Sequence, residues 1–188
     1  DRDCIKCVFL TGITKFTQIS LFSVLNTLSN ISFYNCYATI CGLTKEEILE
    51  NLKDEIQALA AQKKWDIAQT MHELKDMYDG YHFSESLQGV YNPFSVISAL
   101  KERRLRPYWI ASGATEMLPK ILTNFEKDVE TLDGSLIDMD YLETADISKD
   151  NPKLVLYQLG FLTIKDVIGE AYRLGFPNRE VNGFPPLL

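Results

Sequence analysis

The chain has 188 residues, of which 46% are hydrophobic and 24% are charged, and its formal net charge is −7. This length is enough for one sizeable hydrophobic core or two small ones, and the composition excludes a mainly disordered protein. No run approaches the roughly 18 apolar residues that cross a bilayer, and the first residues lack the plan of a signal peptide, so we expect a cytoplasmic protein with no membrane partner.

A short apolar run near the start, Val8 to Leu10, is followed at once by Thr11, Gly12 and Lys15. The run predicts a strand that is buried on both faces of a parallel sheet. Open α/β sheets bind ligands at the carboxyl ends of their strands, which is where the polar residues would lie. The alternative is an ordinary strand end with a solvent-facing lysine.

Residues 17–43 give mixed signals and we predict no fold for them. Thr44 and Glu47 then form the Thr-x-x-Glu pattern of a capping box. The apolar residues that follow have helical spacing, and they are Ile48, Leu52, Ile56 and Leu59. A second helix is predicted over residues 64–78, ending at Asp79 and Gly80.

Asn92 and Pro93 predict the start of a third helix, with Asn as its cap. Basic residues crowd the last turn of that helix, where they complement the negative end of the helix dipole, and they are Lys101, Arg103 and Arg104. We expect a short strand over residues 108–112. The next predicted helix places four apolar residues on one face, namely Leu118, Ile121, Leu122 and Phe125.

The negative charge is concentrated in residues 125–150, which contain nine acidic and two basic side chains. This segment therefore accounts for the whole net charge. We interpret it as a solvated connector, and an acidic docking loop or metal-binding loop is the alternative. The spacing of its carboxylates does not match a calcium-binding loop.

Asn151 and Pro152 predict a further helix, which ends at Gly160. Residues 161–167 and 171–176 predict two strands around a turn at Gly169. A helix followed by two strands is the plan of a winged-helix module, and the Pro-rich tail is typical of a linker. The acidic chain has no basic stripe near these strands, which argues against DNA binding by this part.

The cysteines and histidines give little support for a catalytic or metal site. Cys4-x-x-Cys7 and Cys36-x4-Cys41 resemble two halves of a zinc site, but reduced thiols in a cytosolic core are the better interpretation. For His72 we expect a partly buried structural position on its helix. For His82, in the aromatic sequence YDGYHF, we expect a packing role.

Several segments resemble, in the same order, a predicted AAA-like P-loop ATPase family that is widespread in anaerobic bacteria. They are VFLTGITKF (8–16), LFSVLNTLSNIS (21–32), CGLTKEE (41–47), MYDGYHFS (77–84), VYNPFSVISAL (90–100), YWIASG (108–113), NPKLVLYQLGFLTI (151–164) and YRLGFPNREV (172–181). The resemblance implies a mixed α/β, mostly helical fold that forms the C-terminal part of a P-loop NTPase module. It divides the chain into an ATPase core remnant with the sensor-1 strand (1–43), a helical lid (44–125), the acidic connector (126–150) and a winged-helix-like end with a linker (151–188).

The same resemblance implies a role for Thr11 and Lys15 as sensor-like catalytic residues near the γ-phosphate of ATP. Arg103, Arg104 and Arg106 include candidates for a sensor-2-like or interdomain arginine, although a capped helix end explains them equally well. The phosphate-binding pattern GxxxxGK[ST] is absent, as is an apolar strand that ends in Asp-Glu for magnesium. The sequence therefore contains no cofactor-binding residue or metal ligand that we can assign.

We accordingly expect ATP and Mg²⁺ to bind only in a longer protein, whose N-terminal P-loop half would be the main partner of this chain. Members of the family often carry a PD-(D/E)XK nuclease-like domain after the ATPase, so nucleic acid would be a partner only of the longer protein. The expected function is that of a lid that couples nucleotide state to conformational change, inactive alone. The alternatives are a protein-interaction module and a nucleic-acid-binding winged helix.

Overall fold

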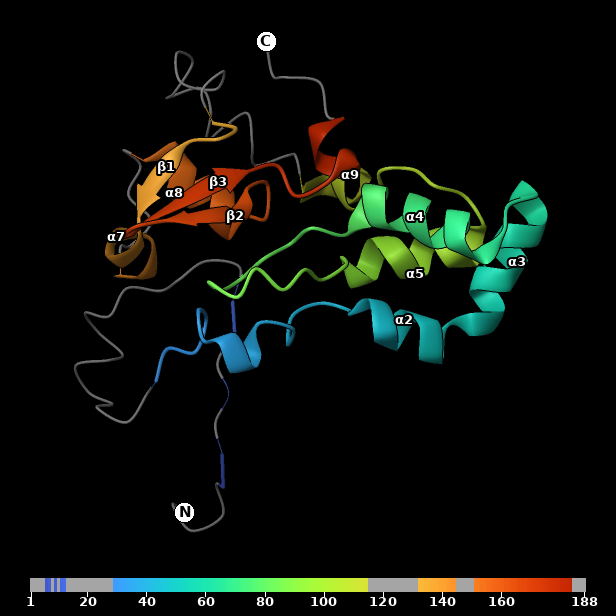
Figure 1. Cartoon of the computed structure of the whole chain (residues 1–188), viewed down its shortest axis with the longest axis horizontal. Helices are drawn as coiled ribbons and strands as arrows, with labels where there is room; N and C mark the ends of the chain where they lie inside the picture. The colour runs from blue at the N-terminus through green and yellow to red at the C-terminus, as the bar shows by residue number, and fades with distance from the viewer. Residues whose placement is uncertain are drawn as a thin grey trace.

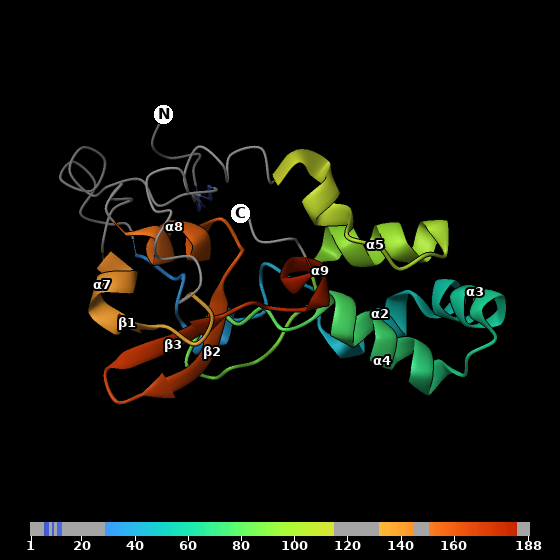
Figure 2. The same cartoon turned by 90° about the horizontal axis from the view of Figure 1, so that it is seen from above.

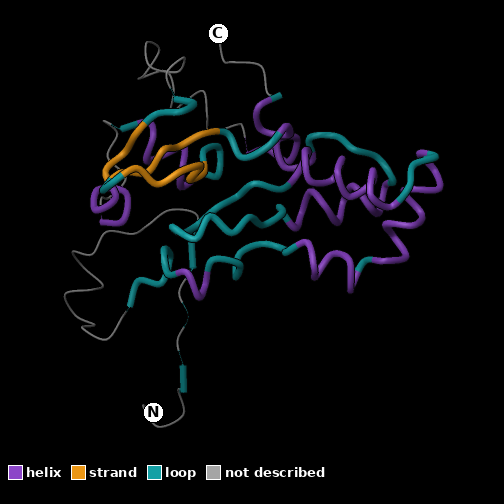
Figure 3. Tube along the Cα trace, in the orientation of Figure 1, coloured by secondary structure: helices purple, strands orange, loops and turns teal. Residues whose placement is uncertain are grey.

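The structure is a computed structural model of the whole chain, and it describes residues 6–7, 9, 11–12, 29–114, 132–144 and 151–183. This part is mixed α/β: helices take up about half of it, and the strands form one small antiparallel sheet (Figures 1 and 3). The α/β class predicted from the sequence is confirmed.

Two groups of elements lie at opposite ends of the molecule (Figures 1 and 2). The helical group contains α2 (Lys45–Asn51), α3 (Lys53–Lys63), α4 (Ile67–Tyr78) and α5 (Pro93–Glu102). The sheet group contains β1 (Leu136–Asp138), α7 (Met139–Thr144), α8 (Pro152–Gln158), β2 (Thr163–Ile168) and β3 (Ala171–Gly175). Between the two groups lies α9 (Arg179–Asn182). Two further short helical segments are η2 (Asn35–Tyr37) and the π-helical η3 (Ile110–Ala114).

The predicted capping box is present at the start of α2. The Thr44 side chain accepts a hydrogen bond from the Glu47 backbone N–H at 3.2 Å, and Glu47 accepts one from the Thr44 N–H at 2.8 Å. The single helix expected here is two helices, because Leu52 leaves the helical conformation. The Asn51 side chain donates to the Glu47 carbonyl at 2.8 Å and so competes with the backbone just before the break.

Side-chain caps fix the starts of α4 and α5. The Asp66 carboxylate accepts from the Gln69 N–H at 2.6 Å, so α4 starts three residues later than predicted. The Asn92 side chain accepts from the Ser95 N–H at 3.2 Å, and Pro93 occupies the first turn of α5 as predicted. Arg103, in the left-handed conformation with φ 54°, ends α5.

The strand predicted over residues 108–112 is wrong, because this segment is helical and runs into η3. The Ala111 N–H donates to the Pro107 carbonyl at 3.1 Å, as in a helical turn. The Trp109 N–H donates to the Glu180 carboxylate at 2.8 Å. A cap supplied from 71 residues away in sequence cannot be detected by local pattern.

The acidic segment is not simply a solvated connector, since its described part contains β1 and α7. Ile137 and Leu142 are buried in the core beside the sheet. The Asp138 carboxylate accepts from the Tyr141 N–H at 2.8 Å and caps α7. The acidic residues Asp138, Asp140 and Glu143 therefore lie within a short strand and helix that also bury Ile137 and Leu142.

The strand order in the sheet is β1-β3-β2, and both pairs are antiparallel. The predicted strand pair around Gly169 is confirmed as β2 and β3, and this glycine has a positive φ of 59°. The third strand, β1, was not predicted from the sequence; it pairs Ile137 with Tyr172 on the other side of β3.

Two separate hydrophobic cores hold the described elements together. One lies among the helices of the helical group and contains Ile48, Ile56, Leu59, Met71, Leu74, Met77, Tyr78, Tyr91, Val96, Ala99, Leu100 and Tyr108. The other lies beside the sheet and contains Ile110, Leu132, Ile137, Leu142, Leu154, Leu156, Phe161, Leu162, Ile164, Tyr172, Leu174 and Val181. We call them the helical core and the sheet core.

Candidate functional site

The segment predicted to carry catalysis is described only in part. Phe9, Thr11 and Gly12 have neither helical nor strand conformation, and all three are exposed, with Phe9 60% exposed. The described residues thus do not show the buried strand that the apolar run predicts. Lys15 lies outside the described residues, as do Val8 and Leu10. The catalytic roles of Thr11 and Lys15 stay predictions.

Several described titratable side chains with shifted pKa values, among them His82, Lys165 and Glu180, gather where the helical group meets the sheet group. The segment that joins α4 to α5 lies at this place and is fixed by paired backbone hydrogen bonds. Tyr81 and Val90 bond each other, with the Val90 N–H donating to the Tyr81 carbonyl at 3.0 Å. Leu43 and Tyr91 do the same, with the Tyr91 N–H donating at 2.8 Å.

His82 connects this segment to the start of β2 through three contacts. Its backbone N–H donates to the Thr163 hydroxyl oxygen at 2.7 Å, and the same hydroxyl donates to the His82 carbonyl at 3.0 Å. The imidazole Nδ1 lies 2.7 Å from the Ile164 carbonyl oxygen. Because a carbonyl only accepts, Nδ1 carries the proton, which leaves Nε2 as the acceptor in the neutral ring.

The electrostatics of His82 favour the neutral imidazole. Burial lowers its pKa, the Ile164 carbonyl raises it, the positive charge of Lys165 lowers it and Asp79 raises it, with a net shift downward. A Cβ atom at Gly89 would lie 3.3 Å from His82 Nε2 and 3.2 Å from Asp79 Oδ1. The glycine thus leaves room for the imidazole and the carboxylate beside the backbone.

Lys165 on β2 reaches the same region from the sheet. Its ammonium group donates to the Pro177 carbonyl at 2.9 Å. Burial lowers the pKa of this lysine, against the opposing effect of Asp133 and Asp79. Gly80 lies directly against the Pro177 carbonyl and has a φ of 93°, so a side chain at this position would meet both a steric clash and an unfavourable backbone conformation.

Glu180 on α9 is the most deeply buried acidic residue described, at 1% exposure. Both of its carboxylate oxygens accept from the Ser95 hydroxyl, at 2.8 and 3.0 Å, and one accepts from the Trp109 N–H at 2.8 Å. Burial raises its pKa, while these hydrogen bonds lower it, and the net shift is upward. The carboxylate thus joins α9 to α5 and to the segment before η3.

Residues beside Glu180 add further contacts between α9 and α4. The Asn178 side chain donates to the Asp79 carbonyl at 2.9 Å. Arg179 lies 3.6 Å from the Glu73 carboxylate, in an ion pair in which the arginine is 58% exposed. We call the set formed by Asp79, His82, Ser95, Lys165 and Glu180 the interlayer junction.

The chemistry of the interlayer junction is that of a structural connection. Its hydrogen bonds join elements of the helical group to the sheet group or to α9. Across the described residues, no three His, Cys, Asp or Glu side chains come together as a metal-binding group. Ser95 and Glu180 do place a hydroxyl beside a carboxylate, but both residues are buried, at 0% and 1% exposure, so a substrate has no access to the pair.

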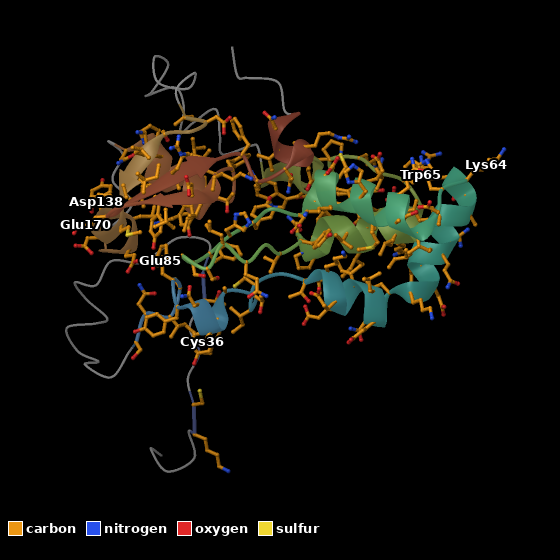
Figure 4. The ribbon with its side chains drawn as sticks, in the orientation of Figure 1. Cys36, Lys64, Trp65, Glu85, Asp138 and Glu170 are labelled. Atoms are coloured by element: carbon orange, nitrogen blue, oxygen red, sulfur yellow. The ribbon has the colours of Figure 1, made fainter. Side chains whose placement is uncertain are left out.

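Other residues considered from the sequence lie away from the junction. His72 is exposed rather than partly buried, and it lies 3.5 Å from Asp76 in an i,i+4 pair. Among the described cysteines, Cys7, Cys36 and Cys41 are free thiols as expected, but they are exposed and not in a core. Cys36 lies on η2, and Figure 4 shows it far from Lys64 and Trp65 at the other end of the molecule.

The basic end of α5 is explained by local contacts in the case of Arg106. Its guanidinium group lies 2.7 Å from the Glu102 carboxylate and 4.8 Å from the centre of the Tyr108 ring. Arg103 and Arg104 are exposed. A sensor-2-like role for any of the three stays a prediction.

Asp79, Lys165 and Glu180 were not predicted from the sequence as site residues. Asp79 served only as a helix-stop signal, and Lys165 and Glu180 have the local appearance of surface residues on a strand and a helix. Glu180 becomes buried only because its partners Ser95 and Trp109 lie 85 and 71 residues away. No local signal could have found such a site, whereas the aromatic sequence around His82 did indicate a packed segment.

Comparison with known proteins finds a relative in Azotobacter chroococcum mcd 1. The chain is 30% identical over 181 residues to a protein of Azotobacter chroococcum mcd 1 described as "Uncharacterized protein in vnfD 5'region", in an alignment that covers 94% of this chain and 33% of the relative. The chain thus spans about a third of the length of that relative. No family model matches the chain, and no solved structure matches it. Within the described residues, no helix is both long and apolar enough to cross a membrane.

Proposed function

We propose that this chain is the lid and C-terminal part of an AAA-like P-loop ATPase and that it couples nucleotide state to conformational change within a longer bacterial protein. The observation that carries the proposal is the division of the described residues into two hydrophobic cores with a polar junction between them. Two packed bodies that meet through a few hydrogen bonds can change their relative orientation without unfolding.

The sheet group supports the winged-helix-like part of the proposal. Its elements follow the order β1, α7, α8, β2, β3, and the strand that comes first in sequence pairs with the last. This arrangement suits a small module that packs against a lid and transmits its movement. Resemblance of the sequence to the ATPase family supports the same assignment.

Nucleic-acid binding by this module alone is the weaker alternative. In a winged helix the helix immediately before the strand pair would have to enter a DNA groove, and here that helix is α8. Its residues Leu154, Val155 and Leu156 are buried, and the Tyr157 ring stacks on Phe33 with 6.1 Å between ring centres. A net charge of −7 also opposes binding to phosphates.

ATP and Mg²⁺ are, in this proposal, the substrate and metal of the longer protein. The residues of this chain do not fit a complete nucleotide site, because GxxxxGK[ST] is absent from the sequence and the described carboxylates form no metal-binding group. The N-terminal P-loop half is the proposed main partner, and a C-terminal nuclease-like domain is a further one. We keep the cytoplasm as the proposed location.

Substitutions at the proposed sensor positions test the function in a longer protein that carries this sequence. We expect Thr11→Val and Lys15→Ala each to lower the ATP turnover number on the order of 100-fold, with smaller effects on ATP affinity and thermal stability. The reason is that a contact to developing phosphate charge strengthens in the transition state. Steady-state ATPase assays, calorimetric ATP binding and thermal unfolding supply the three measurements.

Matched substitutions in the same part of the chain are the controls. Thr14→Val and Lys6→Ala make the same chemical changes at positions with no proposed role, and we expect turnover close to that of the unmodified protein. Turnover within a factor of about two for both Thr11→Val and Lys15→Ala would remove the catalytic assignment, since one lost electrostatic contact should cost far more.

A further inference from the structure

Glu180 lies in an environment that is costly for a carboxylate. Its side chain is buried beside Val181, which belongs to the sheet core, and it contacts Ser95, whose neighbour Val96 belongs to the helical core. Removing an ionised group from water is unfavourable unless hydrogen bonds replace its hydration. A residue in such a place must therefore be matched by specific donors.

The donors come from the first turns of two different helical segments. Ser95 is the third residue of α5, and its hydroxyl reaches both Glu180 oxygens at 2.8 and 3.0 Å. Trp109 lies in the first turn of the helical segment that runs into η3, and its backbone N–H reaches Oε1 at 2.8 Å. The first turn of a helix leaves N–H groups without internal partners, and its dipole favours a negative charge.

Glu180 follows closely on residues that attach the chain after β3 to the end of α4. Three residues before it, Pro177 accepts from Lys165 and lies against Gly80, and Asn178 donates to the Asp79 carbonyl at 2.9 Å. The chain that leaves β3 is thus fixed first to the end of α4 and then, through Glu180, to the start of α5. Together these contacts set the direction in which the sheet group extends from the helical group.

We propose that Glu180 is the positioning residue that sets the orientation of the sheet core relative to the helical core. Its carboxylate accepts hydrogen bonds from α5 and from the segment before η3 at the same time, so the two segments and α9 are held as one unit. Loss of the carboxylate separates the movements of the two cores while each core remains packed. The inference deepens the proposed function, and it rests on that function only for its consequence for ATP turnover.

Distance measurements on the full 188-residue chain test the proposal. With the four native cysteines replaced by serine, spin labels are attached at Gln62→Cys, close to Lys64, and at Glu170→Cys. Figure 4 shows Lys64 and Glu170 at opposite ends of the molecule, so the label pair spans both cores. We expect a narrow distance distribution for the starting protein and a clearly broader one for Glu180→Ala.

Hydrogen exchange supplies a second measurement on the same variants. We expect amides of residues 95–97 and 109–111 to exchange about tenfold faster in Glu180→Ala, as the loss of one or two hydrogen bonds predicts. Amides of β2 and β3 should keep their exchange rates, because the sheet core stays packed. Glu180→Gln should stay close to the starting protein, since its amide oxygen can accept from Trp109 while its NH₂ group donates to the Ser95 oxygen.

Glu73→Gln is the matched control, because it removes an ion pair between α4 and α9 in which the arginine side chain is 58% exposed and the glutamate side chain 25% exposed. It should change neither the distance distribution nor the exchange rates. Equal broadening in Glu73→Gln, or an unchanged distribution in folded Glu180→Ala, would overturn the proposal. If Glu180→Ala does not fold, Ser95→Ala decides: faster exchange at residues 109–111 supports the proposal, and unchanged exchange overturns it.

The two proposals fail separately. An unchanged inter-core distance in Glu180→Ala would remove the positioning role of Glu180 and leave the ATPase assignment untouched. Unchanged turnover in Thr11→Val and Lys15→Ala would remove the catalytic assignment and leave the measured coupling between the two cores standing.

Discussion

His82 is the histidine whose protonation the fold opposes. Burial lowers its pKa more than the Ile164 carbonyl raises it, so the folded state binds this proton less readily than the unfolded chain does. Between the lowered folded pKa and the unfolded value near 6.5, the unfolded state holds more protons, and stability rises with pH. We therefore expect His82 to cost stability as the pH falls below about 6.5.

Urea unfolding at several pH values between about 5 and 7.5, a range that brackets the ordinary histidine pKa, measures this contribution. In His82→Gln the part of the pH slope that comes from this site should disappear. His72→Gln is the control and should keep it, because His72 is 69% exposed beside Asp76. A titration of the His82 ring by NMR that gave a pKa above about 6.5 would contradict the expected direction.

Both the backbone conformation and the lack of space for a side chain require glycine at position 80. Gly134 has a positive φ but no such crowding, so the two glycines can be compared. The φ of Gly80 is 93°, and a Cβ at this position would clash with the Pro177 carbonyl, whereas a Cβ at Gly134, with φ 78°, would meet no atom within 4 Å. We expect Gly134→Ala to lower the free energy of unfolding by about 1 kcal/mol for the backbone conformation alone. Gly80→Ala should lower it by about 3 kcal/mol or more, because the clash adds to that cost.

Chemical denaturation of both variants provides the comparison. The difference between them, not either value alone, reports how tightly the end of α4 lies against the chain that leaves β3. Equal losses in the two variants would show that Pro177 moves aside at little cost, and that the interlayer junction is looser than the structure indicates.

At the scale of elements, β1 attaches the acidic segment to the sheet core, because it pairs with β3 and buries Ile137. Ile137 is buried at 6% exposure in the sheet core, while its neighbour Leu136 is 49% exposed. We expect Ile137→Ala to lower the free energy of unfolding by about 2–4 kcal/mol and Leu136→Ala to change it by less than about 0.5 kcal/mol. Denaturant unfolding measures both changes. Similarly small losses of unfolding free energy in the two variants would show that the segment is only a connector.

At the scale of the whole molecule, the chain alone should not bind ATP·Mg²⁺ with useful affinity. The sequence lacks the glycine-rich phosphate-binding pattern, so backbone N–H groups, a lysine and a hydroxyl are not arranged around a triphosphate. Titration calorimetry on the 188-residue chain checks this expectation. Saturable binding in the micromolar range would place a nucleotide site within this chain. It would contradict the proposal that ATP binds mainly to the N-terminal P-loop half of a longer protein.

Local signals in the sequence determined much of the secondary structure. The capping box at Thr44, the Asn-Pro start of α5 and the strand pair around Gly169 all act between residues close in sequence, and the structure contains each of them. The apolar residues predicted for the first helical face also lie in or against the helical core, although Leu52 interrupts the helix. Capping and apolar periodicity depend on spacing along one segment, which is why they can be predicted from the sequence.

Tertiary structure decided the rest. The Glu180 carboxylate accepts a hydrogen bond from the first turn of the helical segment 108–114, β1 is a strand because β3 offers it hydrogen-bond partners, and Glu180 itself is buried only by elements distant in sequence. The relative orientation of the two cores also depends on contacts between residues that are distant in sequence. Contacts between residues 71 and 85 positions apart leave no periodic trace in the sequence, because they depend on how separate elements pack in space.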